Sequence, residues 1–173
     1  MRLPPLLLLL LLIAAPALAQ IPPPALEWRS YDYPAMGFGV HFPAEPSVVR
    51  GTYATATGSV PASIYSVKHE NVEYRMTVAD FSAAKTDEKT AIDAAVKTWA
   101  TDGREIKLDV EARINRRYGR ELSVGGKDGS YAMVAIFFFN NRLYELSGRA
   151  LPPNATISTG RTIRFQQSLQ FLD

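Results

Sequence analysis

The sequence contains few residues that could carry catalysis. It has no cysteine among its 173 residues and only two histidines, His41 and His69. The absence of cysteine excludes thiolate nucleophiles, zinc–thiolate sites and iron–sulfur clusters. The histidines could still meet in space and bind a metal ion with Glu70 or Glu73, but no H-E-x-x-H or related spacing supports such a site. The pattern favours structural or surface histidines.

Other catalytic motifs are missing as well. There is no G-x-S-x-G nucleophile elbow, and the carboxylates are scattered along polar faces rather than paired for acid–base chemistry. The loop 125–129 resembles a phosphate-binding loop in composition, but it lacks the G-K-[ST] ending, and a strand rather than a helix follows it. We therefore expect a hairpin turn there and a protein that is not an enzyme and uses no cofactor.

One group of aromatic residues could bind a partner. Trp28, Tyr31 and Tyr33 lie just before the first clear strand. They could pack the N-terminal segment onto the sheet, or they could line a binding surface, because exposed aromatic side chains are common at interfaces.

Arginines form a second candidate surface around Arg116 and Arg117, together with Arg113 and Arg120. They could be a solvated turn at a strand edge or a small anion-binding patch that contributes to partner binding. Lys and Arg number 19 in the whole chain against 17 Asp and Glu. Without Arg2 the balance is 18 against 17, a net charge of +1, which is too small for a nucleic-acid-binding protein.

The first residues have the features of a signal peptide. Arg2 gives a positive start, residues 6–13 are apolar, and small residues at Ala17 and Ala19 suit a signal peptidase. A membrane anchor is the alternative, but Pro16 interrupts the apolar run before it reaches the length of a membrane span. We expect residues 1–19 to be removed after Ala19. The mature protein would then be periplasmic or extracellular and have no membrane span.

Residues 20–35 read as an extended segment and residues 36–173 as a single domain. In residues 38–42 apolar side chains alternate with Gly39 and His41, as in a strand with one face on a core. Residues 62–69 and 72–81 read as a hairpin around Glu70 and Asn71.

The hydrophobic period then changes to that of a helix. Between residues 86 and 102, the positions of Ile92, Ala95, Val96 and Trp99 follow the i, i+3, i+4, i+7 spacing of an amphipathic helix. We expect Trp99 to be buried with Ile92 and Val96 where this helix docks, and Gly103 to cap its end.

Strands dominate the remainder. Residues 105–115 alternate, with Ile106 to Ile114 predicted to face the core, and residues 118–124 form the next strand. Residues 130–139 are apolar on both faces and predict a central strand, which Asn140 and Asn141 connect to residues 142–149. A second helix could run from Asn154 to about Gln167. The layout predicts an α+β fold: a mostly antiparallel sheet with helices packed on it.

Three segments resemble those of PsbP-like domains. They are Gly37 to Pro43 with Pro46, Asn141 to Leu146, and Arg164 to Leu169. They are similar to the "GF-x-V-x-FP-x-x-P", "NRLYxL" and "RFxxSF" elements of these domains, although Leu169 replaces the last Phe. The resemblance implies a sheet with helices on both sides, the α/β/α sandwich shared by photosystem II PsbP and a Ran-binding protein.

Fold alone is a poor guide to function. The first hypothesis is an exported, non-catalytic binding or assembly module of the cell envelope with an envelope protein as its partner. The alternative is a protein that binds a small ligand or a metal ion in a cleft between sheet and helix. An enzyme whose site no local motif reveals is a third possibility.

Overall fold

The computed structural model describes residues 27–84, 86–153, 155 and 158–172. Strands predominate, with two α-helices and one short 3-10 helix among the described residues. In chain order the elements are β1 (Arg29–Tyr33), η1 (Pro34–Met36), β2 (Phe38–Phe42), β3 (Ser47–Thr55), β4 (Gly58–His69), β5 (Val72–Asp80), α1 (Glu88–Trp99), β6 (Glu105–Ile114), β7 (Arg117–Gly125), β8 (Tyr131–Phe139), β9 (Arg142–Ala150), α2 (Thr159–Gln166) and β10 (Gln170–Phe171).

Seven strands form one antiparallel sheet in the order β3-β4-β5-β9-β8-β7-β6. Most neighbours are hairpins whose turns use residues that tolerate a positive φ. Asn140 and Asn141, for example, have φ values of 49° and 55° between β8 and β9. The predicted antiparallel α+β fold is confirmed. The two-sided apolar strand β8 lies inside the sheet, away from both edges, as its composition predicts.

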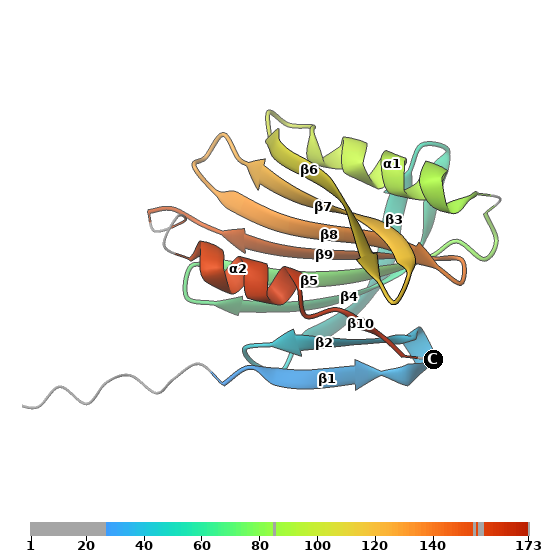
Figure 1. Ribbon diagram of the computed structural model, residues 1–173, viewed down its shortest axis with the longest axis horizontal. Coiled ribbons are helices and arrows are strands. Elements are labelled where there is room, and N and C mark those ends of the chain that lie inside the picture. Colours follow the sequence, from blue (N-terminus) through green and yellow to red (C-terminus); the bar gives the residue numbers. More distant parts are fainter. Residues whose placement is uncertain (1–26, 85, 154, 156–157, 173) are drawn as a thin grey trace, which may run out of the picture.

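The molecule has three layers (Figure 1). Helix α1 packs on one side of the large sheet, here called the α1 face, and α2 packs on the other, the α2 face. Each face has its own core, because successive strand residues point to opposite sides. The α1-face core includes Ile92, Leu122, Val134, Ile136 and Leu143, and the α2-face core includes Tyr74, Met76, Phe137, Leu146 and Phe165.

A small sheet in the order β1-β2-β10 completes the layer on the α2 face. Phe38, Val40 and Phe42 of β2 are buried against that core, as their alternation predicts. Strand β1 lies in the segment expected to be merely extended, but it pairs antiparallel with β2 along its full length, so it is part of the domain. The pairing with β10 joins this N-terminal region to residues 170–171 at the other end of the described chain.

Helix α1 begins at the cap residue Asp87, whose carboxylate accepts hydrogen bonds from the Thr90 backbone N–H at 3.0 Å and the Thr90 hydroxyl at 2.7 Å. Ile92 is fully buried, but the prediction that Trp99 and Val96 are buried with it is wrong: both are only partly buried. Trp99 shows why. The reason is its position. It is the last helical residue, and its ring lies at the margin of the core beneath the Arg104 guanidinium, 5.0 Å from the ring centroid.

The cap predicted at Gly103 is also wrong. The helix is capped at Ala100, and Asp102 and Gly103, with φ values of 57° and 70°, form the turn into β6 instead.

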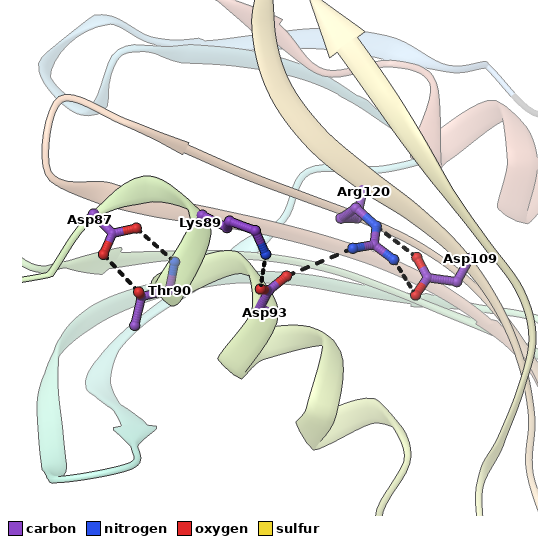
Figure 2. A network of polar contacts seen from close by, with 6 residues as sticks. All are labelled: Asp87, Lys89, Thr90, Asp93, Asp109 and Arg120. Carbon is purple, nitrogen blue, oxygen red and sulfur yellow. Dashed lines mark hydrogen bonds and ion pairs between the residues drawn. The ribbon is translucent and has the colours of Figure 1, made fainter.

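An ionic network fastens α1 to the edge of the sheet (Figure 2). Arg120 on β7 donates to Asp109 on β6 at 2.8 Å and forms an ion pair with Asp93 on α1 at 3.7 Å. Asp93 also accepts a hydrogen bond from Lys89 one turn earlier, at 2.6 Å. The side chain of Arg120 is 22% exposed, so this network is partly shielded from solvent and links three elements.

The prediction that Ile106 to Ile114 all face one core is wrong. Strand β6 contains a bulge between Ile106 and Leu108. A bulge inserts one residue and reverses the alternation, so Ile106 points to the α1 face, whereas Leu108 and Val110 point to the α2 face. Helix α2 packs on β8 and β9 and does not cover this edge. Leu108 and Val110 therefore remain 51% and 39% exposed.

Helix α2 begins at Thr159, and the predicted cap, Asn154, lies outside the described residues. The helix approaches β9 closely at Gly148, where an added Cβ would lie 2.9 Å from the Thr162 Cα. Neither described helix is long and apolar enough to cross a membrane.

Candidate functional site

The α1 face is only partly covered. Helix α1 packs mainly over β7 and β8, and beyond its C-terminal end the face above β5 and β9 is open. A cleft of about 620 Å³ lies there, a volume typical of sites for small organic molecules. Its walls come from β3, β4, the end of α1 and two loops, and the lining includes Tyr53, Ile64, Arg75, Thr77, Thr98, Trp99, Arg104, Lys127, Asp128, Glu145, Ser147 and Arg149.

The floor of the cleft carries a carboxyl group, that of Glu145, in the middle of β9 opposite Thr77 of β5. The Tyr53 hydroxyl donates a hydrogen bond to Glu145 Oε2 at 2.9 Å. The Trp99 indole N–H lies close enough to interact with the same carboxyl, although its Nε1 is buried without a hydrogen bond of normal geometry.

Burial raises the pKa of Glu145, and the nearby Tyr53 hydroxyl and Trp99 N–H offset only part of this effect. Burial also raises the pKa of Tyr53, and the neighbouring Glu145 adds to that shift. A carboxyl group with a perturbed pKa in a cleft is a frequent mark of a functional site.

Ion pairs hold the rim in place. Arg149 pairs with Asp128 at 2.6 Å and with Glu73 at 3.7 Å, and its Nε donates to the Ser130 hydroxyl at 3.1 Å. Asp128 also accepts a hydrogen bond from the Ser130 backbone N–H at 3.0 Å, which fixes the β7–β8 turn. The predicted hairpin turn at residues 125–129 is confirmed.

The two rim loops touch each other at Gly103. Its φ of +70° already favours glycine, and an added Cβ would lie 1.5 Å from Lys127 Cε. The aliphatic part of Lys127 therefore lies over Gly103, and this contact closes one side of the cleft between the α1–β6 loop and the β7–β8 turn.

The two histidines lie on different sheets, His41 on β2 and His69 at the end of β4. Among the residues that the structure describes, no three His, Asp or Glu side chains are arranged to hold a metal ion. The cleft offers hydrogen bonds, charge and an aromatic wall, and this combination suits binding.

The aromatic residues predicted as a partner surface lie on the opposite side of the large sheet from the cleft. All three side chains are partly buried against the α2-face core. Their contacts are Trp28 on Tyr74, Tyr31 on Phe42 and Tyr33 on Phe38, with ring centroids 5.3, 6.1 and 5.0 Å apart. This packing attaches the N-terminal strand to the core, the structural alternative considered for these residues.

The two candidate arginines lie where β6 turns into β7, Arg116 in the turn and Arg117 as the first residue of β7. Arg116 is exposed in the turn, with a φ of 69°. The guanidinium of Arg117 lies over the rings of Phe139, at 3.8 Å, and Phe171, at 4.9 Å. Phe171 pairs with Phe38 in the small sheet, so Arg117 belongs to the same α2 side as the aromatic group, while Arg116 points to solvent at the turn.

Sequence reasoning named Glu73 as a possible metal ligand but did not identify the polar cleft residues as one site. They form two polar rows that alternate with buried side chains: Glu73, Arg75 and Thr77 on β5, and Glu145, Ser147 and Arg149 on β9. The available signal was a polar row within strands that are otherwise buried, such as Glu145 between Tyr144 and Leu146. The pairing of β5 with β9 that brings the rows together joins distant parts of the chain and leaves no local signal.

No protein-family model matches the chain, and no curated protein matches it. Among solved structures, it is similar to the solution structure of cyanobacterial PsbP (CyanoP) from Synechocystis sp. PCC 6803, with a TM-score of 0.60 and 10% identity, covering 84% of this chain and 93% of that one. A crystal structure of PA94 from Pseudomonas aeruginosa, a protein of unknown function, matches with a TM-score of 0.43 and 7% identity, covering 65% and 90% of the two chains.

The match to CyanoP defines the class of fold. Three layers, an antiparallel sheet and a helix on each face give this chain a PsbP-like α+β fold, as the sequence resemblance implies. At 10% identity the similarity establishes the fold and nothing about the ligand.

Proposed function

We propose that this protein is a non-catalytic binding module that is exported from the cytoplasm and takes a small ligand into the cleft beside α1. The observation that carries the proposal is the Glu145 carboxyl on the floor of an open cleft, held by Tyr53 and flanked by the Trp99 ring. Burying a carboxyl group costs free energy. A carboxyl group in such a position therefore serves recognition or catalysis more often than it serves stability.

Binding explains the lining better than catalysis does. The Tyr53 hydroxyl donates a hydrogen bond to the Glu145 carboxyl, and burial raises the pKa of Tyr53, which makes it a poor nucleophile. The PsbP-like fold agrees with an accessory module rather than an enzyme. Export rests on the signal-peptide features of residues 1–19.

A thermal-shift screen against a library of small metabolites tests the proposal. A ligand at about 100 times its Kd adds about 2.7 kcal/mol to the stability of the folded state. Thr98→Trp should abolish the shift, because Thr98 is an exposed residue at the end of α1 that lines the cleft. Lys97→Trp is the matched control, since Lys97 is the exposed neighbour and does not line the cleft. A shift that survives Thr98→Trp would place the ligand elsewhere.

Docking of an envelope protein is the second candidate function. The observation in its favour is that both edge strands of the large sheet expose apolar side chains: Val48 and Val49 on β3, and Leu108 and Val110 on β6. The group of Trp28, Tyr31, Tyr33, Arg116 and Arg117 stays a proposed contribution to such a surface. Capture of one partner from envelope extract by the protein, lost in Leu108→Glu and kept in Thr98→Trp, would favour this function over the first.

A further inference from the structure

The acidic and the basic side chains that line the cleft differ in how many of them have an ion-pair partner within the protein. Three of the acidic side chains have a cationic partner within the protein: Asp128 and Glu73 pair with Arg149, and Asp102 pairs with Arg104. The fourth acid is Glu145, on the floor, whose partly buried position disfavours its charged form. Three of the four carboxyl groups of the lining are therefore already paired with a cation of the protein, and Glu145 is the one that is not.

Two basic side chains of the lining differ from most of the acidic ones in their pairing. Within the described part of the chain, neither Arg75 nor Lys127 has a carboxylate within ion-pair distance, and both side chains are exposed. Arg75 is opposite Ser147 in the sheet and diagonal to Glu145, because Thr77 is the residue that faces Glu145 directly. Diagonal neighbours are about 7–8 Å apart at their Cα atoms, so Arg75 influences Glu145 through space without pairing with it.

The other two basic side chains of the lining already interact with groups of the protein. Arg104 donates to the Thr98 carbonyl at 2.6 Å and lies over the Trp99 ring, and Arg149 is held by the rim carboxylates. What the cleft offers to a ligand is therefore the guanidinium of Arg75, the ammonium of Lys127 and an apolar wall that includes Ile64 and Trp99.

We propose that the ligand is a small organic anion, a carboxylate or phosphate ester, whose charged group binds Arg75 and whose apolar body packs beside Trp99. The inference rests on the proposed binding function and adds the chemical class of the ligand. A guanidinium binds either group through two parallel hydrogen bonds, which are stronger than bonds between neutral groups. A cationic ligand is disfavoured, because it would meet the unpaired Arg75, and because three of the four carboxyl groups of the lining are already paired.

Tryptophan fluorescence provides the test. The chain has two tryptophans, so Trp28→Phe leaves Trp99, at the cleft, as the only one. In this background the purified protein is titrated with benzoate, phenyl phosphate, benzamide and benzylamine, which share one ring and differ in charge. We expect at least one anion to change the fluorescence saturably and to bind more than about tenfold more tightly than benzamide, with an affinity that falls as salt is added.

Arg75→Gln should weaken binding of that anion by about tenfold or more, and Arg75→Lys by less. Arg50→Gln is the control, because Arg50 is exposed on β3 and lines a separate hollow together with Ser63 and Asp80. Tighter binding of benzamide or benzylamine than of either anion, or an anion affinity unchanged by Arg75→Gln, would overturn the inference while leaving a binding cleft in place. If no probe of any charge changes the Trp99 signal, the inference fails. If the metabolite screen also gives no shift that depends on Thr98, the proposed function fails with it.

Discussion

At the scale of single residues, the Glu145 carboxyl lies among groups with opposing effects on its pKa. Burial raises the pKa, while the Tyr53 hydroxyl and the Trp99 N–H lower it, and burial has the larger effect. Arg75 and Arg104 also lower it, from a greater distance. The folded protein therefore holds a proton on this group at a higher pH than the unfolded chain does, and stability must depend on pH through it.

We predict that Glu145→Gln changes the pH dependence of stability. Well below the ordinary Glu pKa of 4.5, Glu145 is neutral in both states. As the pH rises above 4.5, the unfolded chain loses this proton first, so the wild type loses stability relative to the Gln variant until the folded pKa is passed. Urea denaturation at pH 4 and pH 7.5 measures the difference, which should favour Gln more at pH 7.5. Equal differences at both pH values would contradict the raised pKa.

At the scale of elements, the sequence predicted most strands and both helices, because alternation and the 3.6-residue period are local signals. The sequence-based prediction was wrong where the structure has an irregularity, such as a β-bulge, that does not interrupt the alternation of apolar residues. Residues 105–115 alternate without interruption, yet the bulge before Leu108 turns the rest of β6 to the α2 face. Similarly, the spacing from Ile92 and Val96 to Trp99 places all three side chains on one face of α1. How deeply Trp99 is buried depends on where the helix ends over the sheet, and the spacing does not show this.

The contact between α2 and β9 predicts that replacing two nearby glycines by alanine has opposite effects on the stability of the protein. Gly148→Ala would place a Cβ 2.9 Å from the Thr162 Cα, so α2 must move, and we expect a destabilisation of about 1–3 kcal/mol. Gly160 lies within α2, has no atom near its Cβ position and has no positive φ. Gly160→Ala should stabilise the protein by up to about 1 kcal/mol, because alanine favours the helix.

Chemical denaturation of both glycine variants and the wild type checks this prediction. Equal midpoints for Gly148→Ala and the wild type would show that α2 does not need the close approach. A lower midpoint for Gly160→Ala would show that its surroundings are more crowded than the structure indicates.

At the scale of the whole molecule, the large sheet separates two kinds of surface. The α2 face is closed by a helix, a small sheet and the aromatic residues of β1, and its core joins both ends of the described chain. The α1 face has one helix and leaves space for the cleft. The sequence could predict the layers from hydrophobic patterns and offered a cleft between sheet and helix as an alternative. It could not predict where the cleft lies or which residues line it, because that depends on which part of a face the helix leaves open.

The last prediction concerns the compartment in which this molecule acts. We expect the exported protein to begin at Gln20, because Ala17 and Ala19 provide the small side chains that a signal peptidase requires. Intact-mass measurement of the protein from the exported fraction determines the first residue. Ala19→Arg should block the cleavage and leave a longer, unprocessed species, whereas Ala25→Arg, an equal change in charge beyond the site, should leave cleavage intact. An exported protein that still carries Met1 would contradict the assignment, and so would equal processing of the two variants. In either case the small residues Ala17 and Ala19 would no longer support cleavage after Ala19.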